Sequence, residues 1–215
     1  MADMERLRRM MVDQQIARRG VGDARLLAAM RDVPRDQFVP EELRAHAHDD
    51  MPLPLGAGQT ISQPYIVAVM IEAAAIKPDD RVLEVGLGSG YAAAIMSRLA
   101  AQVFAIERIA ELADEAAARM AALGYDNVTI RAGDGTEGWP EQAPFDVISV
   151  AAGGPAVPQP LRDQLAVGGR LIMPIGTAAE QRLVRLVRED AETFVEQRLE
   201  AVRFVPLIGA HGWQG

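Results

Sequence analysis

The stretch Arg81–Tyr91 reads RVLEVGLGSGY and constrains how the rest of the chain can fold. Its first residues are mostly apolar, glycines then occupy alternate positions from Gly86 to Gly90, and apolar residues resume in Ala92–Met96. This order predicts a strand, a tight loop and a helix. Glycine adopts positive φ and has no Cβ to keep a ligand from the backbone, and a helix start offers unpaired N–H groups. We therefore expect a nucleotide-like site at the carboxyl end of a parallel strand.

The spacing of the glycines indicates which ligand the loop holds. A dinucleotide fingerprint would place its third glycine at position 91, which is Tyr91, whereas the pattern here is E-x-G-x-G-x-G, starting at Glu84. A second apolar run, VFAI, ends in Glu107, 21 positions after Gly86, where a carboxylate can accept hydrogen bonds from both hydroxyls of a ribose. Together these features resemble the cofactor-binding motif of S-adenosylmethionine-dependent methyltransferases. The alternative is an ordinary tight turn beside a solvated Glu107.

Composition limits the class of protein. The chain has 215 residues, 49% of them hydrophobic and 24% charged, which is typical of one globular domain. A net charge of −8 argues against wholesale binding to nucleic acid, and the lack of cysteine excludes thiolate catalysis and cysteine-based zinc sites. The N-terminus has no apolar signal core, and the longest apolar run, Ile66–Ile76, is interrupted by Glu72. We therefore expect a cytoplasmic protein with no membrane partner.

The first fifty residues are expected to form a helical cap. Apolar residues among charged ones over residues 3–19 predict an amphipathic helix ending before Gly20. Asp23 is a candidate N-cap for a second helix that ends at Val33-Pro34. Pro40 can begin a third helix over Glu41–His48.

Two histidines in that third segment could suggest a metal site. His46 and His48 lie beside Asp49 and Asp50. Because residues two apart on a helix point to different faces, we interpret them as a solvated helix end and predict no metal site.

A loop and a helix follow the cap. Four Pro and Gly residues between Met51 and Gln59 exclude regular structure up to Gln59, so residues 51–63 are predicted to be a long exposed loop. Ser62-Gln63-Pro64 then begins a helix whose inward residues include Val67 and Ile71. Ser62 could be the N-cap of this helix or a functional residue, and periodicity alone leaves both open.

Alternating strands and helices continue to the C-terminus. Helices are predicted at Ile109–Leu123 and Pro158–Leu165. Asp134, flanked by glycines, should lie at a strand end beside the first two, although an Asp-Gly turn is the simpler explanation. The segment Val202–Leu207 can only be an edge or terminal strand because it contains Pro206. Beyond the first two strands, further strands are predicted at Val128–Arg131, Phe145–Val150, Arg170–Pro174, Gln181–Arg188 and Thr193–Arg198.

Seven segments together closely resemble the protein-L-isoaspartate O-methyltransferase family, in the right order and over nearly the whole chain. They are GQTISQPYIVA, VLEVGLGSGY, Glu107-Arg108, GDGTEGW, PFDVISVAAGGP, QLAVGGRLIMPIG and VRFVPL. The resemblance implies an α/β, Rossmann-like class I methyltransferase fold. This fold has a mostly parallel seven-stranded sheet with helices on both faces and an antiparallel C-terminal strand pair. It further implies a single domain over residues 1–215, made of the cap (1–50), an active-site loop (51–63) and a sheet core (64–215).

The family uses S-adenosylmethionine to methylate the free α-carboxylate of L-isoaspartyl residues in damaged proteins, after which the ester closes to a succinimide. By resemblance, Ser62 is the catalytic residue, and no metal is expected. The implied cofactor contacts are Gln59, Thr60, Glu84, Gly86, Gly88, Glu107, Arg108, Asp134 and Gly135. The implied substrate contacts are Ile61, Ser62, Tyr65, Val205, Pro206 and Leu207. We expect a monomer whose partners are damaged proteins and peptides.

The chain departs from the family pattern at three places. Tyr65 stands where histidine is common, Leu87 replaces a small or hydroxyl residue, and Gly153-Gly154 replaces alanines. These departures leave room for a methyltransferase acting on another peptide or small-molecule carboxylate. The rivals from other classes are a dehydrogenase, disfavoured by Tyr91, and a binding module that keeps the fold without turnover.

Overall fold

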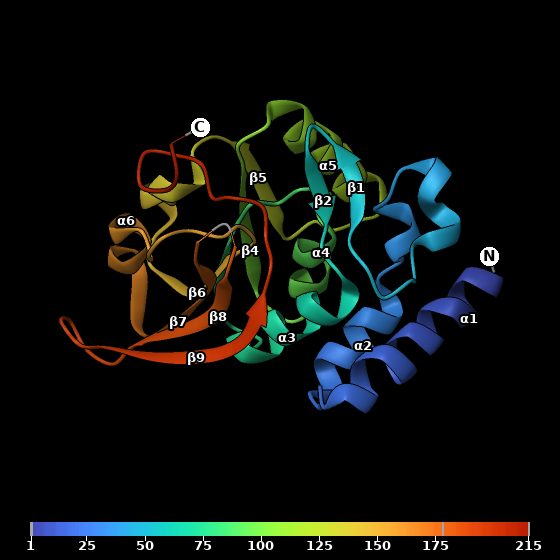
Figure 1. The fold of residues 1–215 in the computed structure, drawn as a ribbon, viewed down its shortest axis with the longest axis horizontal. Coiled ribbons are helices and arrows are strands. Elements are labelled where there is room, and N and C mark those ends of the chain that lie inside the picture. The colour runs from blue at the N-terminus through green and yellow to red at the C-terminus, as the bar shows by residue number, and fades with distance from the viewer. Residues whose placement is uncertain (1, 178, 215) are drawn as a thin grey trace.

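The computed structural model describes residues 2–177 and 179–214, and its centre is a seven-stranded sheet (Figure 1). The strand order is β5-β4-β3-β6-β7-β8-β9. The first five strands in this order are parallel, and β8 runs antiparallel to both β7 and β9. The predicted mostly parallel sheet with an antiparallel C-terminal pair is thus confirmed. The strands are β3 (Arg81–Val85), β4 (Gln102–Glu107), β5 (Val128–Ala132), β6 (Phe145–Val150), β7 (Leu165–Gly176), β8 (Gln181–Arg188) and β9 (Phe194–Val202).

The register of the central strands brings their carboxyl ends to one edge of the sheet. Val85 of β3 lies opposite Ile106 of β4 and Val150 of β6. The next residues of these three strands are therefore neighbours, although they are far apart in sequence. This edge is where an open parallel sheet holds a ligand.

Both faces of the sheet are apolar, and helices cover both. Alternate strand residues such as Val82 and Val103 pack in one buried cluster with α3 (Pro64–Ala74), α4 (Tyr91–Ser97) and residues of α5 (Ala110–Ala122). The residues between them, such as Leu83 and Phe104, pack in a second cluster with α6 (Gln159–Asp163). The period of two places successive side chains on opposite faces, so every central strand is buried on both sides.

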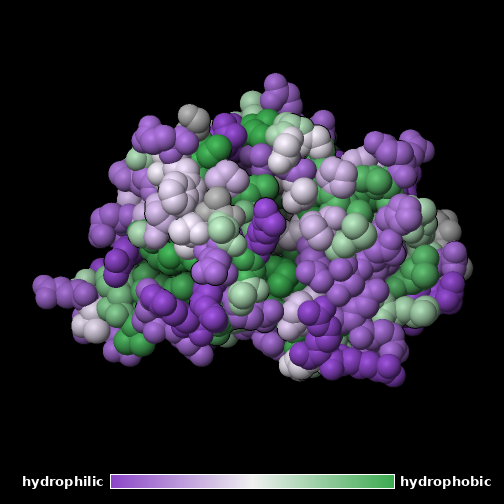
Figure 2. Space-filling view, in the orientation of Figure 1, coloured by the Kyte–Doolittle hydropathy of each residue, from purple (hydrophilic) through white to green (hydrophobic). Residues whose placement is uncertain are grey.

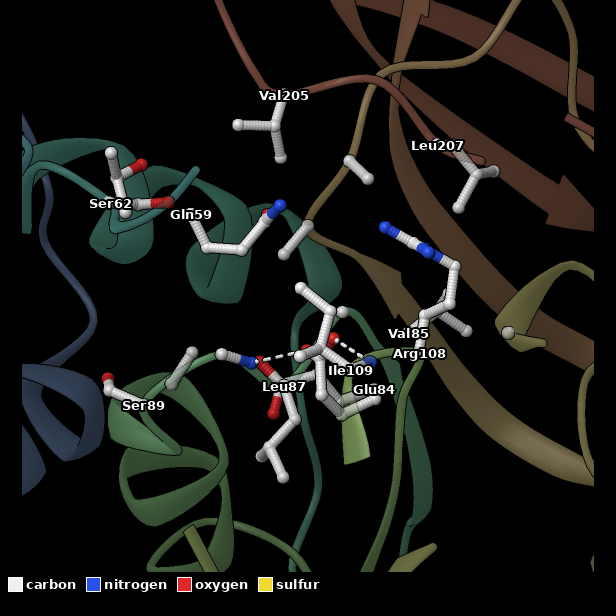
Figure 3. A pocket seen from close by; sticks show the side chains of 18 of the residues that line it. Gln59, Ser62, Glu84, Val85, Leu87, Ser89, Arg108, Ile109, Val205 and Leu207 are labelled. Carbon is white, nitrogen blue, oxygen red and sulfur yellow. Dashed lines mark hydrogen bonds between the residues drawn. The ribbon is translucent and has the colours of Figure 1, made fainter. Parts of the chain in front are cut away.

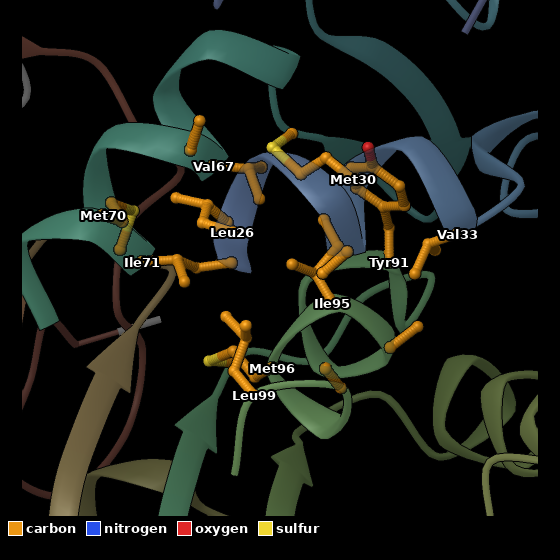
Figure 4. Close-up of a cluster of buried hydrophobic side chains, with 14 of the residues drawn as sticks. Leu26, Met30, Val33, Val67, Met70, Ile71, Tyr91, Ile95, Met96 and Leu99 are labelled. Atoms are coloured by element: carbon orange, nitrogen blue, oxygen red, sulfur yellow. The ribbon is translucent and has the colours of Figure 1, made fainter. Parts of the chain in front are cut away.

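The N-terminal cap packs against two of these helices. It contains α1 (Ala2–Met10), a π-helical turn Met11–Ile16, a 3-10 turn Ala17–Arg19 and α2 (Ala24–Asp32). Asp23 caps α2 as predicted, since its carboxylate accepts hydrogen bonds from the amides of Arg25 (2.8 Å) and Leu26 (3.0 Å). In Figure 4, Leu26, Met30 and Val33 of the cap meet side chains of α3 and α4 in one apolar cluster. Burial of such side chains contributes about 1.5–3 kcal/mol each, which fixes the cap to the core.

The predicted third helix of the cap is wrong in kind and length. It is a 3-10 helix over Glu41–His46 and stops before Ala47 and His48, which are both buried. Expecting a solvated helix end is therefore correct only for exposed His46, whose Nδ1 lies 2.9 Å from Asp49. His48 packs inside the cap 4.0 Å from Asp36, and burial lowers the pKa of its imidazole.

The segment before α3 is also more regular than predicted. Strands β1 (Leu53–Gly56) and β2 (Gln59–Ile61) form a small antiparallel hairpin, with Leu53 opposite Ile61. Pro54 is tolerated because a two-stranded ribbon has free edges, where a missing N–H costs no ladder bond. Gly56, Ala57 and Gly58 turn the chain with positive φ angles of 94°, 48° and 71°. The Pro and Gly residues that seemed to exclude structure are the residues that shape this hairpin.

The surface in the same orientation is mostly hydrophilic (Figure 2). Apolar surface gathers in a hollow between α6 and β9, which is lined by residues including Val157, Ile175 and Val184. Over residues 2–177 and 179–214, none of the helices has the length and apolar character needed to cross a membrane.

Candidate functional site

The glycine loop turns over the carboxyl end of β4. Gly86, Gly88 and Gly90 all have positive φ, at 86°, 54° and 88°. The Gly86 amide donates to the carbonyl of Ile106 at 2.9 Å, and α4 begins at the next residue after Gly90. The predicted strand, tight loop and helix are confirmed, and the loop presents its backbone to the sheet edge.

Glu107 closes the loop from the neighbouring strand. Its carboxylate is buried and accepts hydrogen bonds from the amides of Gly88 (2.8 Å) and Ile109 (3.0 Å), the dashed lines in Figure 3. A carboxylate has about four lone-pair sites, so two acceptor sites remain for ligand hydroxyls. Glu107 can therefore hold the loop and a ribose at the same time. The residues present fit the nucleoside part of S-adenosylmethionine.

Glu84 is a second, more deeply buried carboxyl group at this site. Its side chain is 1% exposed, and its Oε2 has no hydrogen-bond partner among the described residues. Burial, and then the negative charge of Glu107, raise the pKa of Glu84 well above its ordinary value. This environment therefore favours the neutral form of the Glu84 carboxyl group.

This arrangement predicts how stability depends on pH. The raised pKa means that the folded chain holds the Glu84 proton more tightly than the unfolded chain. The stabilisation that this bound proton gives to the folded chain is fully present below the ordinary pKa near 4.5. It is lost as the pH rises through the pKa of Glu84 in the folded chain. Glu84→Gln keeps the shape and removes the ionisation. The difference in melting temperature, Glu84→Gln minus wild type, should therefore increase as the pH rises. A difference in melting temperature that does not change with pH would contradict a raised pKa of Glu84.

A cavity of about 270 Å³ lies between the loop, the hairpin and the C-terminal segment (Figure 3). Most residues expected at the site line it. They are Gln59, Thr60, Ile61, Ser62, Glu84, Gly86, Gly88, Glu107, Arg108, Gly135, Val205, Pro206 and Leu207. Gly135 belongs here because a Cβ on it would lie 2.4 Å from Cγ1 of Val85, so only glycine allows its loop to pack on the end of β3.

Ser62 lies where the cavity meets an outer groove. The groove runs between α3 and the chain after β9, and its lining includes Pro52, Ile66 and Phe204. Cavity and groove share Thr60, Ser62, Ala151 and Val205. A group entering along the groove would reach Ser62 at the point where it meets a ligand in the cavity.

Ser62 is not the cap of α3. The N-cap is Gln63, and no side chain caps this helix end. Instead, Arg35 of the helical cap donates to the Ser62 carbonyl at 3.0 Å and to the Ala47 carbonyl at 2.7 Å. Arg35 is fully buried with its guanidinium 4.7 Å from the ring centre of Tyr91. Arg35 therefore links the cap, the Ser62 loop and α4. The sequence did not indicate this role, because a single arginine forms no recognisable pattern.

The C-terminal segment lies across the cavity without forming a regular strand. β9 ends at Val202, and in the segment that follows, up to Leu207, Pro206 makes an isolated bridge to Gly153. The Gly153 amide donates to the Val205 carbonyl, and the Leu207 amide donates to the Gly153 carbonyl, both at 2.8 Å. The predicted terminal strand over Val202–Leu207 is therefore corrected to a short bridged segment, because Pro206 lacks the N–H that a ladder needs.

The structure does not bring Asp134 and Tyr65 into the cavity. The Asp134 carboxylate accepts hydrogen bonds from the amides of Thr136 (2.8 Å) and Ala210 (2.7 Å). Burial alone would raise the pKa of Asp134, but these hydrogen bonds outweigh it and lower the pKa. Tyr65 lies on α3 with the Arg19 guanidinium 3.3 Å from its ring centre. Asp134 thus connects the C-terminal loop with the sheet edge, and Tyr65 connects α3 with the cap.

Two bulky residues of the glycine motif, Leu87 and Tyr91, serve packing. Leu87 is 4% exposed and belongs to the apolar cluster beneath the loop. Tyr91 is 1% exposed, with its ring centre 5.7 Å from that of Phe38. A bulky, buried residue thus stands where a dinucleotide site requires a third glycine, which disfavours the dehydrogenase alternative.

Comparisons with known proteins agree with this geometry. The family model described as "Protein-L-isoaspartate(D-aspartate) O-methyltransferase (PCMT)" matches residues 6–212. Protein-L-isoaspartate O-methyltransferase 1 of Rhodopseudomonas palustris (strain HaA2) is 59% identical over 96% of this chain and 84% of its own length.

Two solved structures are similar over most of the chain. One, titled protein-L-isoaspartate O-methyltransferase, has a TM-score of 0.84 at 30% identity and covers 95% of this chain and 67% of its own. Another, described as a Plasmodium falciparum protein of this kind in complex with S-adenosyl-L-homocysteine, has a TM-score of 0.82 at 26% identity and covers 94% and 98%. With sequence, sheet order and site geometry in agreement, the chain belongs to the protein-L-isoaspartate(D-aspartate) O-methyltransferase family.

Proposed function

We propose that this chain transfers the methyl group of S-adenosylmethionine to the free α-carboxylate of L-isoaspartyl residues in damaged proteins. The observation that carries the proposal is the place of Ser62, which lines both the cavity and the outer groove. A peptide in the groove can present a carboxylate there, while the glycine loop and Glu107 hold the nucleoside on the other side. The methyl ester then closes to a succinimide, which reopens partly to normal aspartate.

The chemistry requires little from the protein beyond positioning. The cofactor supplies an electrophilic methyl group. A carboxylate is already ionised at neutral pH, so no general base is needed. In-line alignment and exclusion of water remain, and alignment alone can be worth about 7–11 kcal/mol. Beside polar residues such as Glu107 and Arg108, the cavity is lined by glycines and apolar side chains, and these suit a reaction in which opposite charges disappear.

Each part of the site has a role in this reaction. Ser62 Oγ–H donates to one carboxylate oxygen and leaves the other free to attack. The bridged segment Val205–Leu207 lies along the substrate backbone. Backbone contacts are indifferent to side chains, which allows a repair enzyme to accept many sequences. The remaining cofactor contacts are Gln59, Thr60, Arg108 and Gly135. Ile61 contacts the substrate.

Ser62→Ala should reduce turnover of an isoaspartyl peptide by at least about tenfold, because one lost positioning hydrogen bond raises the barrier by about 1.4 kcal/mol. Since Gln63 is the N-cap of α3, the melting temperature should change little. Steady-state kinetics and thermal melting measure the two effects. Ser97→Ala, which removes a hydroxyl bonded within α4, is the matched control and should keep wild-type turnover. Unchanged turnover in Ser62→Ala would remove Ser62 from the reaction.

The function itself is tested by following repair. Incubation of the protein and S-adenosylmethionine with an isoaspartyl peptide should give the methyl ester, then the succinimide, then a mixture containing the aspartyl peptide, as resolved by chromatography. An isoaspartyl peptide that stays unchanged, while the protein methylates a different carboxylate, would favour the alternative of a specialised carboxyl methyltransferase.

The proposal also covers the setting of this activity. The chain is proposed to act as a single methyltransferase domain, as a monomer and in the cytoplasm. In this proposal, the cavity and the groove of one chain together form the complete site. Light scattering and cell fractionation test these points, and a stable dimer or a membrane-bound fraction would contradict them.

A further inference from the structure

The bridged segment that crosses the cavity is held by a side chain as well as by backbone. The Phe204 amide donates to Oε1 of Gln181 at 2.8 Å, and Nε2 of Gln181 donates to the Phe204 carbonyl at 3.3 Å. This amide pair replaces the two bonds that a strand neighbour would give. It acts one residue before Val205, which lines both the cavity and the groove.

Gln181 is well placed to fix the segment because its own backbone is rigid. It is the first residue of β8 and pairs with Gly176 on one side and Val202 on the other. Its side chain is 7% exposed. A buried amide with both ends bonded has little freedom to reorient, so Phe204 is held to the sheet.

Gly153 provides the space that Gln181 occupies. A Cβ at position 153 would lie 2.4 Å from Nε2, 2.6 Å from Cδ and 2.8 Å from Oε1 of Gln181. All three atoms are at the end of a flexible side chain, so an alanine could be accommodated by displacing Gln181. Gly153 also bonds Val205 and Leu207 through its backbone, which an alanine would keep.

We propose that Gln181 is a positioning residue for the isoaspartyl peptide, and that Gly153 is required for it to act. The proposal rests on the proposed function, in which the substrate lies along Val205–Leu207. Gln181 orders this segment before substrate arrives, so less conformational freedom is lost on binding. Gly153 is thereby connected with peptide binding.

The test is a double-mutant cycle with Gly153→Ala, Gln181→Ala and the double variant. Each single change should raise the KM for an isoaspartyl peptide by about three- to tenfold, the scale of one or two neutral hydrogen bonds. The turnover number and the dissociation constant of S-adenosylhomocysteine should change much less. The double variant should be no worse than Gln181→Ala, because both changes remove the same contact. Amide exchange at Phe204 should accelerate in all three proteins.

Two control variants match the changes. Gly22→Ala adds a Cβ that meets nothing within 4 Å, and Gln197→Ala removes an exposed amide on β9. Both should behave as wild type. If the wild type is active and the folded variants Gly153→Ala and Gln181→Ala both keep the wild-type KM, this proposal is overturned while the proposed function stands. Additive losses in the double variant would overturn the pairing of the two residues. A wild type that methylates no isoaspartyl peptide would overturn the proposed function and this proposal with it.

Discussion

Gly88→Val should abolish binding of S-adenosylhomocysteine in a protein that remains folded. Gly88 has φ of +54°, a conformation that costs other residues about 1–2 kcal/mol and a β-branched residue more. A Cβ would already lie 3.5 Å from Cδ1 of Leu55, so the added methyl groups of valine would press on the hairpin. The loop would have to move, and the amide that bonds Glu107 would move with it.

Calorimetry measures the binding, and circular dichroism confirms the fold. Gly124→Val is the matched control, since Gly124 also has positive φ (71°) but lies outside the cavity with nothing within 4 Å of its Cβ position. It should lose stability and keep its affinity. Normal binding by Gly88→Val would mean that the loop is only a turn.

Glu107→Ala should weaken the binding of S-adenosylhomocysteine by at least about tenfold, and by more if the loop also loosens. The carboxylate holds the amides of Gly88 and Ile109 and has acceptor sites left for the ribose. Hydrogen bonds to a charged group are worth about 1.5–3 kcal/mol each, so the loss of one accounts for the tenfold effect.

Two further variants sharpen this result. Glu107→Gln keeps the shape but offers only one acceptor oxygen to the two amides, so its affinity should lie between those of wild type and Glu107→Ala. Glu111→Ala removes an exposed carboxylate in the first turn of α5 and should bind normally. Wild-type affinity in Glu107→Ala would exclude Glu107 from the ribose site.

The sheet was predictable because its residues carry a strong local signal. Strands β3, β4 and β6 are buried on both faces and therefore appear in the sequence as short apolar runs. Phe145–Val150 and Gln181–Arg188 are confirmed to the residue. The glycine loop and Glu107 were predictable for the same reason, since a fixed spacing after each strand determines their place at the sheet edge.

What the sequence left unclear depends on contacts between distant segments. The hairpin around Leu53 exists because Ile61 pairs with it, and Pro54 and Gly56 mask that pairing. The roles of Arg35 and Gln181 come from hydrogen bonds to carbonyls 27 and 23 residues away, which no local pattern encodes. Tyr65 faces Arg19 of the cap rather than the cavity, because the motif position of a residue does not determine where its side chain packs.

The most direct test of the whole account is a labelled-methyl assay with two matched peptides that differ only in carrying L-isoaspartate or L-aspartate at one position. Because Ser62 and the bridged segment are proposed to present the α-carboxylate of the isoaspartyl residue, label should enter the isoaspartyl peptide as a base-labile ester and leave the aspartyl peptide unlabelled. Equal labelling of both peptides, or labelling of the aspartyl peptide alone, would contradict the account.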